Sequence, residues 1–269
     1  MVFENKLRRK LDEGYLAFGA VTQIPSTALV EILGLAGFDF TMIDTEHGLF
    51  DIQTAGELIR AANGAGLSAI VRVIGNEKGV IMKALDLGAQ GVVVPHISTK
   101  DDAARAVEAC RYGRATGRGA CPVVRAADYG LADWPAVQAT SNRDAIAIML
   151  IEDLEGARNV EDILSVGGVD AVYLGPFDMS VAAGYEGNWN HPEIQKALDR
   201  VLAACRERDI PAMHSLLFGP EVETWTDKGV RMFLQRADSA VFGQACKNFL
   251  SSVAPVRDKK FLSAVSARG

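Results

Sequence analysis

Short apolar runs, many of them rich in β-branched residues, recur along the chain, and each is followed by a turn and a stretch with helical periodicity. The eight runs are AFGAV (17–21), FTMID (40–44), AIVRV (69–73), GVVVP (91–95), AIAIMLIE (145–152), AVYLG (171–175), PAMH (211–214) and MFLQ (232–235). Parallel strands that are covered on both faces read as continuous apolar runs. The alternation therefore predicts an α/β fold, a single (β/α)8 TIM barrel. A doubly wound open sheet is the main alternative, but no glycine-rich fingerprint follows the first run.

Two segments lie outside the repeating units. The start, MVFENKLRRKLDEG, predicts a short amphipathic helix that ends at its last glycine, because Phe3, Leu7 and Leu11 fall on one face. We expect residues 1–254 to form the barrel with this helix, and residues 255–269 to form a C-terminal tail that is frayed or exchanged between subunits.

One connection is long, since about 35 residues separate the helix ending near Cys110 from the strand beginning near Ala145. It carries RYGRATGRG and VVRAADYG. Two interpretations stay open: its arginines wrap toward the substrate mouth, or it is a surface excursion with one extra helix around Trp134 to Thr140.

Composition limits the partners. With 269 residues and 49% hydrophobic content the chain can bury a large core. The net charge is −6 and the 28 Lys and Arg residues are scattered, so nucleic acid is not an expected partner. No apolar run approaches the roughly 18 to 20 residues that span a bilayer. The four cysteines have neither metal-site spacing nor disulfide density, which is typical of a cytoplasmic protein.

Reacting groups of a barrel sit at the carboxyl ends of its strands. The second run ends in IDTEHG with Asp44 and His47, the third contains Arg72, the fifth ends at Glu152, and the sixth is followed by Asp178. Taken singly, each of these residues has a purely structural explanation; Arg72, for example, can pair with Asp44 inside the barrel. Together they predict one site at the barrel mouth.

The chemistry of these side chains favours a hard cation. The carboxylates Glu152 and Asp178, with no cysteine and one nearby histidine, suit Mg²⁺ or Mn²⁺, with Co²⁺ as a further option. A cation chelated by a 2-oxo acid would acidify the adjacent carbon, and Arg72 would stabilise the same negative oxygen. No lysine stands at a strand end, where an aldolase acting through a Schiff base needs one.

Several strings closely resemble the HpcH/HpaI aldolase/citrate lyase family: IDTEHG, VRV, LDLGAQGVVVPHI, RY followed by GRG, VVRAADYG, LGPFDMSVAAGY and HPEIQ. The resemblance runs from about Gly37 to Leu198 and more faintly to Phe242. It implies a (β/α)8 barrel whose last helix is exchanged between subunits, assembled as a homo-oligomer, a trimer or hexamer. It also implies a divalent metal, and pyruvate or oxaloacetate as the nucleophilic substrate.

Matching residue by residue, the resemblance implies that Glu152 and Asp178 bind the metal and that Arg72 stabilises the enolate. His47 matches the catalytic base, which acts through a water on the aldol hydroxyl. Asp86, in LDLGAQ, matches the carboxylate paired with that histidine. Because Asp86 ends a helix near the bottom of its own barrel, it can pair with His47 only if a neighbouring subunit supplies it. The alternative is a carboxylate bonded locally near the helix end.

The substrate pocket includes further candidates. Gly175 and Pro176 are expected to shape a turn whose amides reach the substrate carboxylate. The chain departs from the family at Met213, where glycine is common, and at LQRAD after the eighth run. His214 and Arg236 are therefore candidate contacts of the second substrate, with core or rim positions as their alternative.

The leading hypothesis is a metal-dependent aldolase, a carbon-carbon lyase that adds the enolate of pyruvate or a related 2-oxo acid to an aldehyde. His47 favours the aldolase branch over the acyl-CoA-cleaving branch, which usually has an acidic residue there. An oxaloacetate-type decarboxylase is the enzymatic alternative, and a catalytically degenerate metal-binding barrel is the non-enzymatic one. A dinucleotide enzyme is a distant third.

Overall fold

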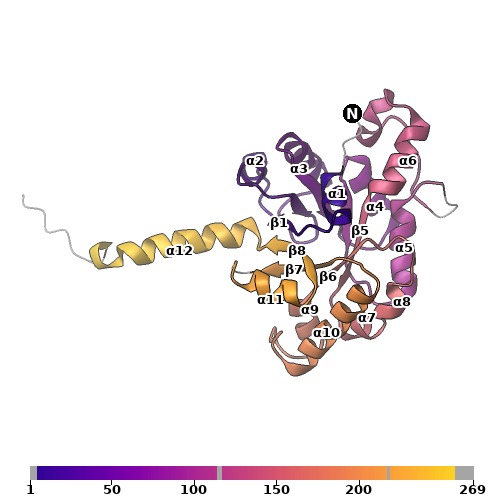
Figure 1. Cartoon of the computed structure of the whole chain (residues 1–269). Coiled ribbons are helices and arrows are strands. Elements are labelled where there is room, and N and C mark those ends of the chain that lie inside the picture. The colour runs from indigo at the N-terminus through magenta and orange to yellow at the C-terminus, as the bar shows by residue number, and fades with distance from the viewer. Residues whose placement is uncertain (1–4, 114–116, 217–218, 258–269) are drawn as a thin grey trace, which may run out of the picture.

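The eight parallel strands of the chain close into a barrel in chain order (Figure 1). The computed structural model describes residues 5–113, 117–216 and 219–257. The strands are β1 (Ala17–Thr22), β2 (Phe40–Asp44), β3 (Ser68–Arg72), β4 (Gly91–Val94), β5 (Ile146–Ile151), β6 (Ala171–Leu174), β7 (Ala212–Leu216) and β8 (Val230–Gln235). Each coincides with one of the predicted runs, so the predicted (β/α)8 barrel is confirmed.

Helices alternate with these strands and surround the barrel (Figure 1). The helices are α1 (Lys6–Asp12), α2 (Thr27–Leu35), α3 (Ile52–Gly64), α4 (Lys78–Asp86), α5 (Lys100–Cys110), the 3₁₀ helix η1 (Arg125–Gly130), α6 (Trp134–Asp144), α7 (Leu154–Arg158), α8 (Val160–Ile163), α9 (Pro176–Ala182), α10 (Pro192–Glu207), α11 (Glu221–Asp227) and α12 (Asp238–Arg257). Within the described ranges, every helix is too short or too polar to cross a lipid bilayer.

Local sequence explains how a barrel helix forms and docks. In α3, the Asp51 side chain accepts a hydrogen bond from the backbone N–H of Thr54 and so caps the amino end. Its buried residues include Ala55, Leu58 and Ile59, spaced three and four apart, so one face of the helix packs against the sheet. The next strand follows after a short turn.

Two apolar layers form the core. The outer layer lies between strands and helices and includes Val71 and Val92, whereas the barrel interior includes Ile70 and Val93. Successive residues of a strand thus alternate between the layers, as period-two geometry requires. This alternation decides which strand-end side chains face the mouth.

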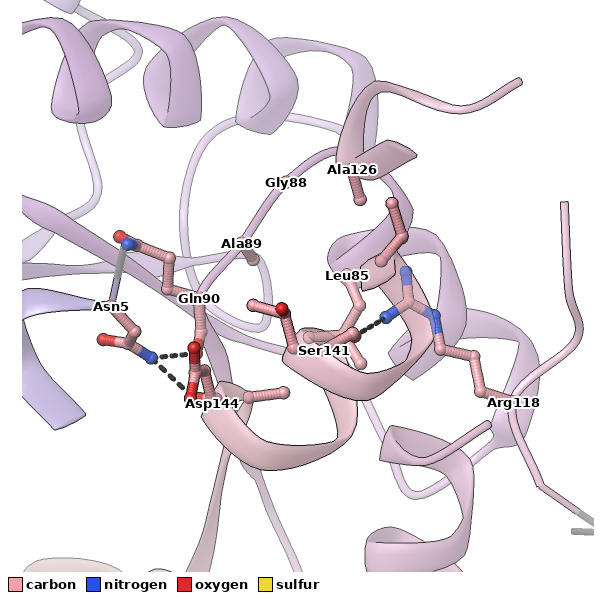
Figure 2. A pocket seen from close by; sticks show the side chains of 12 residues that line it. Asn5, Leu85, Gly88, Ala89, Gln90, Arg118, Ala126, Ser141 and Asp144 are labelled. Carbon is pink, nitrogen blue, oxygen red and sulfur yellow. Dashed lines mark hydrogen bonds between the residues drawn. The ribbon is translucent and has the colours of Figure 1, made fainter. Parts of the chain in front are cut away.

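Helix α1 closes the amino end of the barrel, as its predicted amphipathic pattern requires. Leu7 and Leu11 are buried against the barrel interior. Asn5 Nδ2 donates to the backbone carbonyls of Gln90 and Asp144, at 2.8 and 2.7 Å (Figure 2). A small pocket of about 70 Å³ lies here, at the end opposite the mouth. Phe3, the third predicted apolar position, lies outside the described residues.

The long connection between α5 and β5 also runs to the amino end of the barrel. Arg118 pairs with Asp86, and the Arg125 guanidinium donates to the carbonyl of Leu87, just after α4 (Figure 2 shows Arg118 beside this pocket). The interpretation that these arginines reach their own substrate mouth is therefore wrong. The predicted extra helix is present as α6, although it continues to Asp144.

Helix α12 extends away from the barrel as a long arm (Figure 1). None of its described residues is buried. Its start is tied down because the Asp238 side chain accepts hydrogen bonds from the backbone N–H groups of Gln23 and Ile24. The helix includes Pro255 and so passes the expected boundary between residues 254 and 255, while the assignment of the tail stays a prediction.

Candidate active site

Polar side chains gather at the carboxyl ends of neighbouring strands. Asp44 and Arg72 are the last residues of β2 and β3, and they are register partners across the two strands. Glu152 directly follows β5, and Asp178 lies in the first turn of α9, after β6. Parallel strands that end at one edge bring these predicted residues to the same mouth.

Arg72 is held in place by Asp44. Its Nε lies 2.9 Å from Asp44 Oδ1 and its Nη2 lies 2.7 Å from Oδ2, a bidentate pairing. Asp44 is fully buried and also accepts a hydrogen bond from Gln23 Nε2 at 2.7 Å. Burial alone would raise the pKa of Asp44, but the hydrogen bonds and charge of Arg72 hold this pKa below its ordinary value. The pair therefore fixes a permanent positive charge at the mouth.

Glu46 and Glu152 bring negative charge to the same region. Glu46 Oε2 lies 3.2 Å from Arg72 Nη1 and, among the described residues, has no hydrogen-bond partner although it is buried. Glu152 is buried, and burial raises its pKa. The nearby charges of Glu46 and Asp178 raise this pKa further, whereas the hydrogen bond from the His96 backbone lowers it. The Arg72 guanidinium is shared between Asp44 and Glu46, so these carboxylates are only partly compensated by positive charge.

A divalent cation would supply that charge. Oxygen donors from carboxylates are the ligands preferred by Mg²⁺ and Mn²⁺, so the donor set fits the predicted metal. In the part of the chain that the structure describes, no three His, Cys, Asp or Glu side chains form a ready-made cage. An ion held here would therefore keep coordination positions for water and substrate.

His47 lies at the mouth with 63% of its side chain exposed. Its backbone N–H donates to Asp44 Oδ1, which anchors the turn after β2, and its Nε2 is 4.0 Å from Glu46 Oε2. The imidazole is thus anchored at its backbone while its ring remains accessible to a bound molecule.

Gly175 is placed where no larger residue fits. A Cβ on Gly175 would lie 2.6 Å from the Cβ of Glu152, well inside contact distance. Pro176 follows as the first residue of α9, and its fixed φ suits that position. The predicted turn is present, and its backbone at Gly175 packs directly against the Cβ of Glu152.

Asp86 is the candidate that the fold separates from the others. It ends α4 at the amino end of the barrel, where its Oδ1 lies 2.5 Å from Nη2 of the buried Arg118. Within one chain it therefore does not approach His47. The pairing with Arg118 is the local contact expected under the structural alternative, and the supply of Asp86 by a neighbouring subunit stays a prediction.

His214 does not face the mouth, which corrects its prediction as a substrate contact. The ring is 1% exposed and packs 4.0 Å from the Trp225 ring. Its neighbours on β7 explain this: Met213 belongs to the barrel interior, so His214 points outward toward the helices. Arg236 follows β8 and is exposed, a rim position.

Other residues of the site were not among the predicted site residues. Gln23 follows β1 and braces Asp44, so the rule of inspecting each strand end would have found it. Tyr173 and Ser215 share a 2.6 Å hydrogen bond between β6 and β7 inside the barrel, and no sequence signal joins them. His96, which follows β4, contacts Glu152 directly, with its Nδ1 2.7 Å from Glu152 Oε1.

Comparison with known proteins agrees with this geometry. Residues 22–240 match the profile of the HpcH/HpaI aldolase/citrate lyase family. The chain belongs to this family. The protein is therefore an enzyme, a class II aldolase and carbon-carbon lyase.

Curated relatives and solved structures support the assignment over most of the chain. The 5-keto-4-deoxy-D-glucarate aldolase of Citrobacter koseri is 31% identical over 244 residues, which cover 91% of this chain and 94% of that protein. The Salmonella paratyphi A protein of the same name is 33% identical over 210 residues, 78% and 81% of the two chains. An HpcH/HpaI family protein from Burkholderia cenocepacia superposes with a TM-score of 0.87 at 30% identity, covering 93% of this chain and all of that one.

Proposed function

We propose that this family member cleaves and forms carbon-carbon bonds reversibly through the enolate of pyruvate or a related 2-oxo acid, with an aldehyde as the second substrate. The observation that carries the proposal is the Arg72 guanidinium, fixed by Asp44 beside the carboxylates of Glu46 and Glu152. A preorganised positive charge stabilises an oxygen on which negative charge develops. Because the relatives above are named 5-keto-4-deoxy-D-glucarate aldolases, we favour a keto-deoxy sugar acid as the cleaved substrate.

The proposed cofactor is Mg²⁺ or Mn²⁺, with Co²⁺ as a further option, held by Glu152 and Asp178. When bound, the cation polarises the carbonyl of the 2-oxo acid and makes its neighbouring carbon more acidic. The raised pKa of Glu152 supports this assignment, because burial, together with the charges of Glu46 and Asp178, disfavours the ionised carboxylate, and a bound cation would offset that effect.

Protein residues carry out the other proposed steps of the reaction. Arg72 stabilises the negative oxygen of the enolate, and Gly175 and Pro176 place the first amides of α9 near the substrate carboxylate. His47 transfers the proton of the aldol hydroxyl through a water, which suits an imidazole that is exposed at the mouth.

We also propose a homo-oligomer, a trimer or hexamer in the cytoplasm, in which α12 of one subunit covers the barrel of another. An apolar groove of about 180 Å³ supports this proposal, because it runs over β1 and β8 and includes Phe18, Phe233 and Leu216. On α12, Phe242 and Phe249 are 68% and 65% exposed, and burying them in such a groove removes apolar surface from water. The same assembly would bring Asp86 of one subunit to His47 of the next.

Proton exchange at pyruvate tests the reaction without requiring the aldehyde. Purified protein supplied with Mn²⁺ should exchange the methyl protons of pyruvate for deuterium, measured by NMR. Chelation and Arg72→Ala should each abolish the exchange, whereas Arg143→Ala, at an exposed arginine, should not. Exchange that survives both treatments contradicts the mechanism. Release of CO₂ from oxaloacetate without any aldehyde would instead favour the decarboxylase.

A further inference from the structure

Gln23, the first residue after β1, joins three parts of the structure. Its side-chain Nε2 donates to Asp44 Oδ2 at 2.7 Å, and its backbone carbonyl accepts a hydrogen bond of 3.2 Å from the N–H of Leu49, in the connection after β2. Its backbone N–H donates to Asp238 Oδ1 at 3.1 Å, at the first residue of α12. One residue therefore contacts the partner of Arg72, the connection after β2 and the helix that leaves the barrel.

The Asp44 carboxylate fixes the orientation of the Gln23 amide. Because the pKa of Asp44 is lowered, its carboxylate is ionised and can only accept hydrogen bonds, so the amide nitrogen must face it. The amide oxygen then faces the other way, where the Ser239 hydroxyl lies 3.5 Å from it in the first turn of α12. The amide thus lies between the barrel mouth and the start of α12.

The two oxygens of Asp44 are held by different partners. Oδ1 accepts hydrogen bonds from the backbone N–H groups of Glu46 and His47. Oδ2 accepts one from Gln23, and Arg72 donates to both oxygens. Among the described residues, Gln23 is therefore the one side chain besides Arg72 that hydrogen bonds to Asp44. Rotation of a carboxylate about its Cβ–Cγ bond is soft, and bidentate pairing makes the plane of the guanidinium follow it.

We propose that Gln23 is a positioning residue for Arg72, and that it makes the position of this arginine depend on how α12 begins. The Asp238 carboxylate accepts hydrogen bonds of 3.1 Å from the backbone N–H groups of Gln23 and Ile24, and so holds the backbone from which Gln23 reaches Asp44. This inference rests on the proposed function, because it assumes that Arg72 stabilises the enolate oxygen. An arrangement of α12 that loosens the Asp238 contact lowers activity without changing any group that contacts the substrate.

Gln23→Met tests the positioning role, because methionine is similar in length and flexibility but has no donor. The rate of proton exchange at saturating pyruvate should fall by about 10- to 100-fold, since a misplacement of about 1 Å can cost about 100-fold. The KM for pyruvate should stay near the wild-type value, because Arg72 acts on charge that develops as the enolate forms. Asp238→Ala should lower the rate in the same direction. Gln53→Met, at an exposed position of α3, is the matched control and should not.

A double variant separates positioning from a general loss of structure. In the Arg72→Lys background, which keeps a positive charge, Gln23→Met should reduce the exchange rate much less than it does in the wild type. Two changes that act through one group are not additive. Equal fold losses in the two backgrounds would overturn the inference.

Crystal structures of the variants supply a readout that does not depend on activity. The Arg72 guanidinium should be shifted or divided between two positions in Gln23→Met and Asp238→Ala, and unchanged in Gln53→Met. An Arg72 side chain that keeps its wild-type position in the first two variants would also overturn the inference. A wild-type protein that exchanges no pyruvate protons would instead contradict the proposed function, and the crystal structures would still decide whether Gln23 positions Arg72.

Discussion

Arg72 and Asp44 end neighbouring strands and face each other in register, joined by two hydrogen bonds of 2.9 and 2.7 Å. Because Asp44 is fully buried, this pair has a structural role as well as the catalytic role proposed for Arg72. Loss of the guanidinium would leave a carboxylate without its main partner in the barrel mouth.

Arg72→Ala is therefore expected to impair both activity and stability. We expect kcat to fall by about 10²- to 10³-fold, as when a donor to a developing oxyanion is removed. The free energy of unfolding should fall by about 3 to 5 kcal/mol, because one partner of a buried pair is left uncompensated. Steady-state kinetics and denaturant unfolding measure the two effects. Arg143→Ala, which breaks an exposed pair with Asp144, should leave stability nearly unchanged. Similar losses in both variants would contradict the prediction.

Gly175→Ala should displace Glu152 without changing any charge. The added Cβ would lie 2.6 Å from the Glu152 Cβ, so the strand end must shift. We expect a loss of about 1 to 3 kcal/mol in stability, typical of overpacking, and metal affinity lower by about 10- to 100-fold in calorimetry. Gly167→Ala is the matched control, since its Cβ would meet nothing within 4 Å. Unchanged metal affinity in Gly175→Ala would show that this contact does not position Glu152.

His214 should make stability depend on pH. Burial, with the nearby charge of Lys228, lowers its pKa from 6.5 to about 4. Between these values the unfolded chain binds a proton that the folded chain does not. The contribution of the neutral His214 to the free energy of unfolding is therefore complete above pH 6.5. The free energy of unfolding should fall by about 3 kcal/mol as the pH drops from 6.5 to 4.

Comparison of His214→Phe with the wild type isolates this contribution. Denaturant unfolding at several pH values should show a shallower dependence in the variant, because the titrating ring is gone while an aromatic side chain still fills the space beside Trp225. Activity at neutral pH should be retained, since the ring faces the helices. A variant that folds normally but loses substrate affinity would restore His214 as a substrate contact.

Co-expression of two inactive variants tests the proposed role of Asp86. If Asp86 of one subunit acts on His47 of another, His47→Asn and Asp86→Asn chains should each have low activity. Randomly mixed oligomers should recover about a quarter of wild-type activity, since that share of the interfaces pairs two intact residues. Differently tagged chains allow the mixed species to be purified and assayed. Activity no higher than that of the two variants alone would place the role of Asp86 in its own chain, beside Arg118.

Helix α12 should control assembly. Phe242 and Phe249 are two turns apart and exposed on the projecting arm (Figure 1). Replacing both with Glu should reduce the oligomer to monomers in light scattering, because charged groups are costly to bury in an apolar groove. Lys247→Glu, on the same helix, is the charge control and should leave the mass unchanged. An unchanged oligomer in the double variant would exclude these side chains from the interface.

Local sequence was sufficient for the strands and for the residues that end them. The apolar runs before Asp44, Arg72 and Glu152 predicted buried strands, and strands that are parallel must deliver their last residues to one mouth. A continuous apolar run is a short-range property, so it can be recognised in a few residues.

Tertiary structure alone decided how those residues meet. The ring of His96 reaches Glu152 because β4 and β5 are neighbours and the backbone turns left-handed, and neither fact is visible in the string VVPHI. His214 faces away from the mouth because the register of β7 orients it so, and a shift of one residue would have reversed that face. Arg118 meets Asp86 only because a long connection returns to the amino end of the barrel. Contacts between residues far apart in the chain depend on register, loop path and rotamer, which the local pattern of apolar and polar residues does not encode.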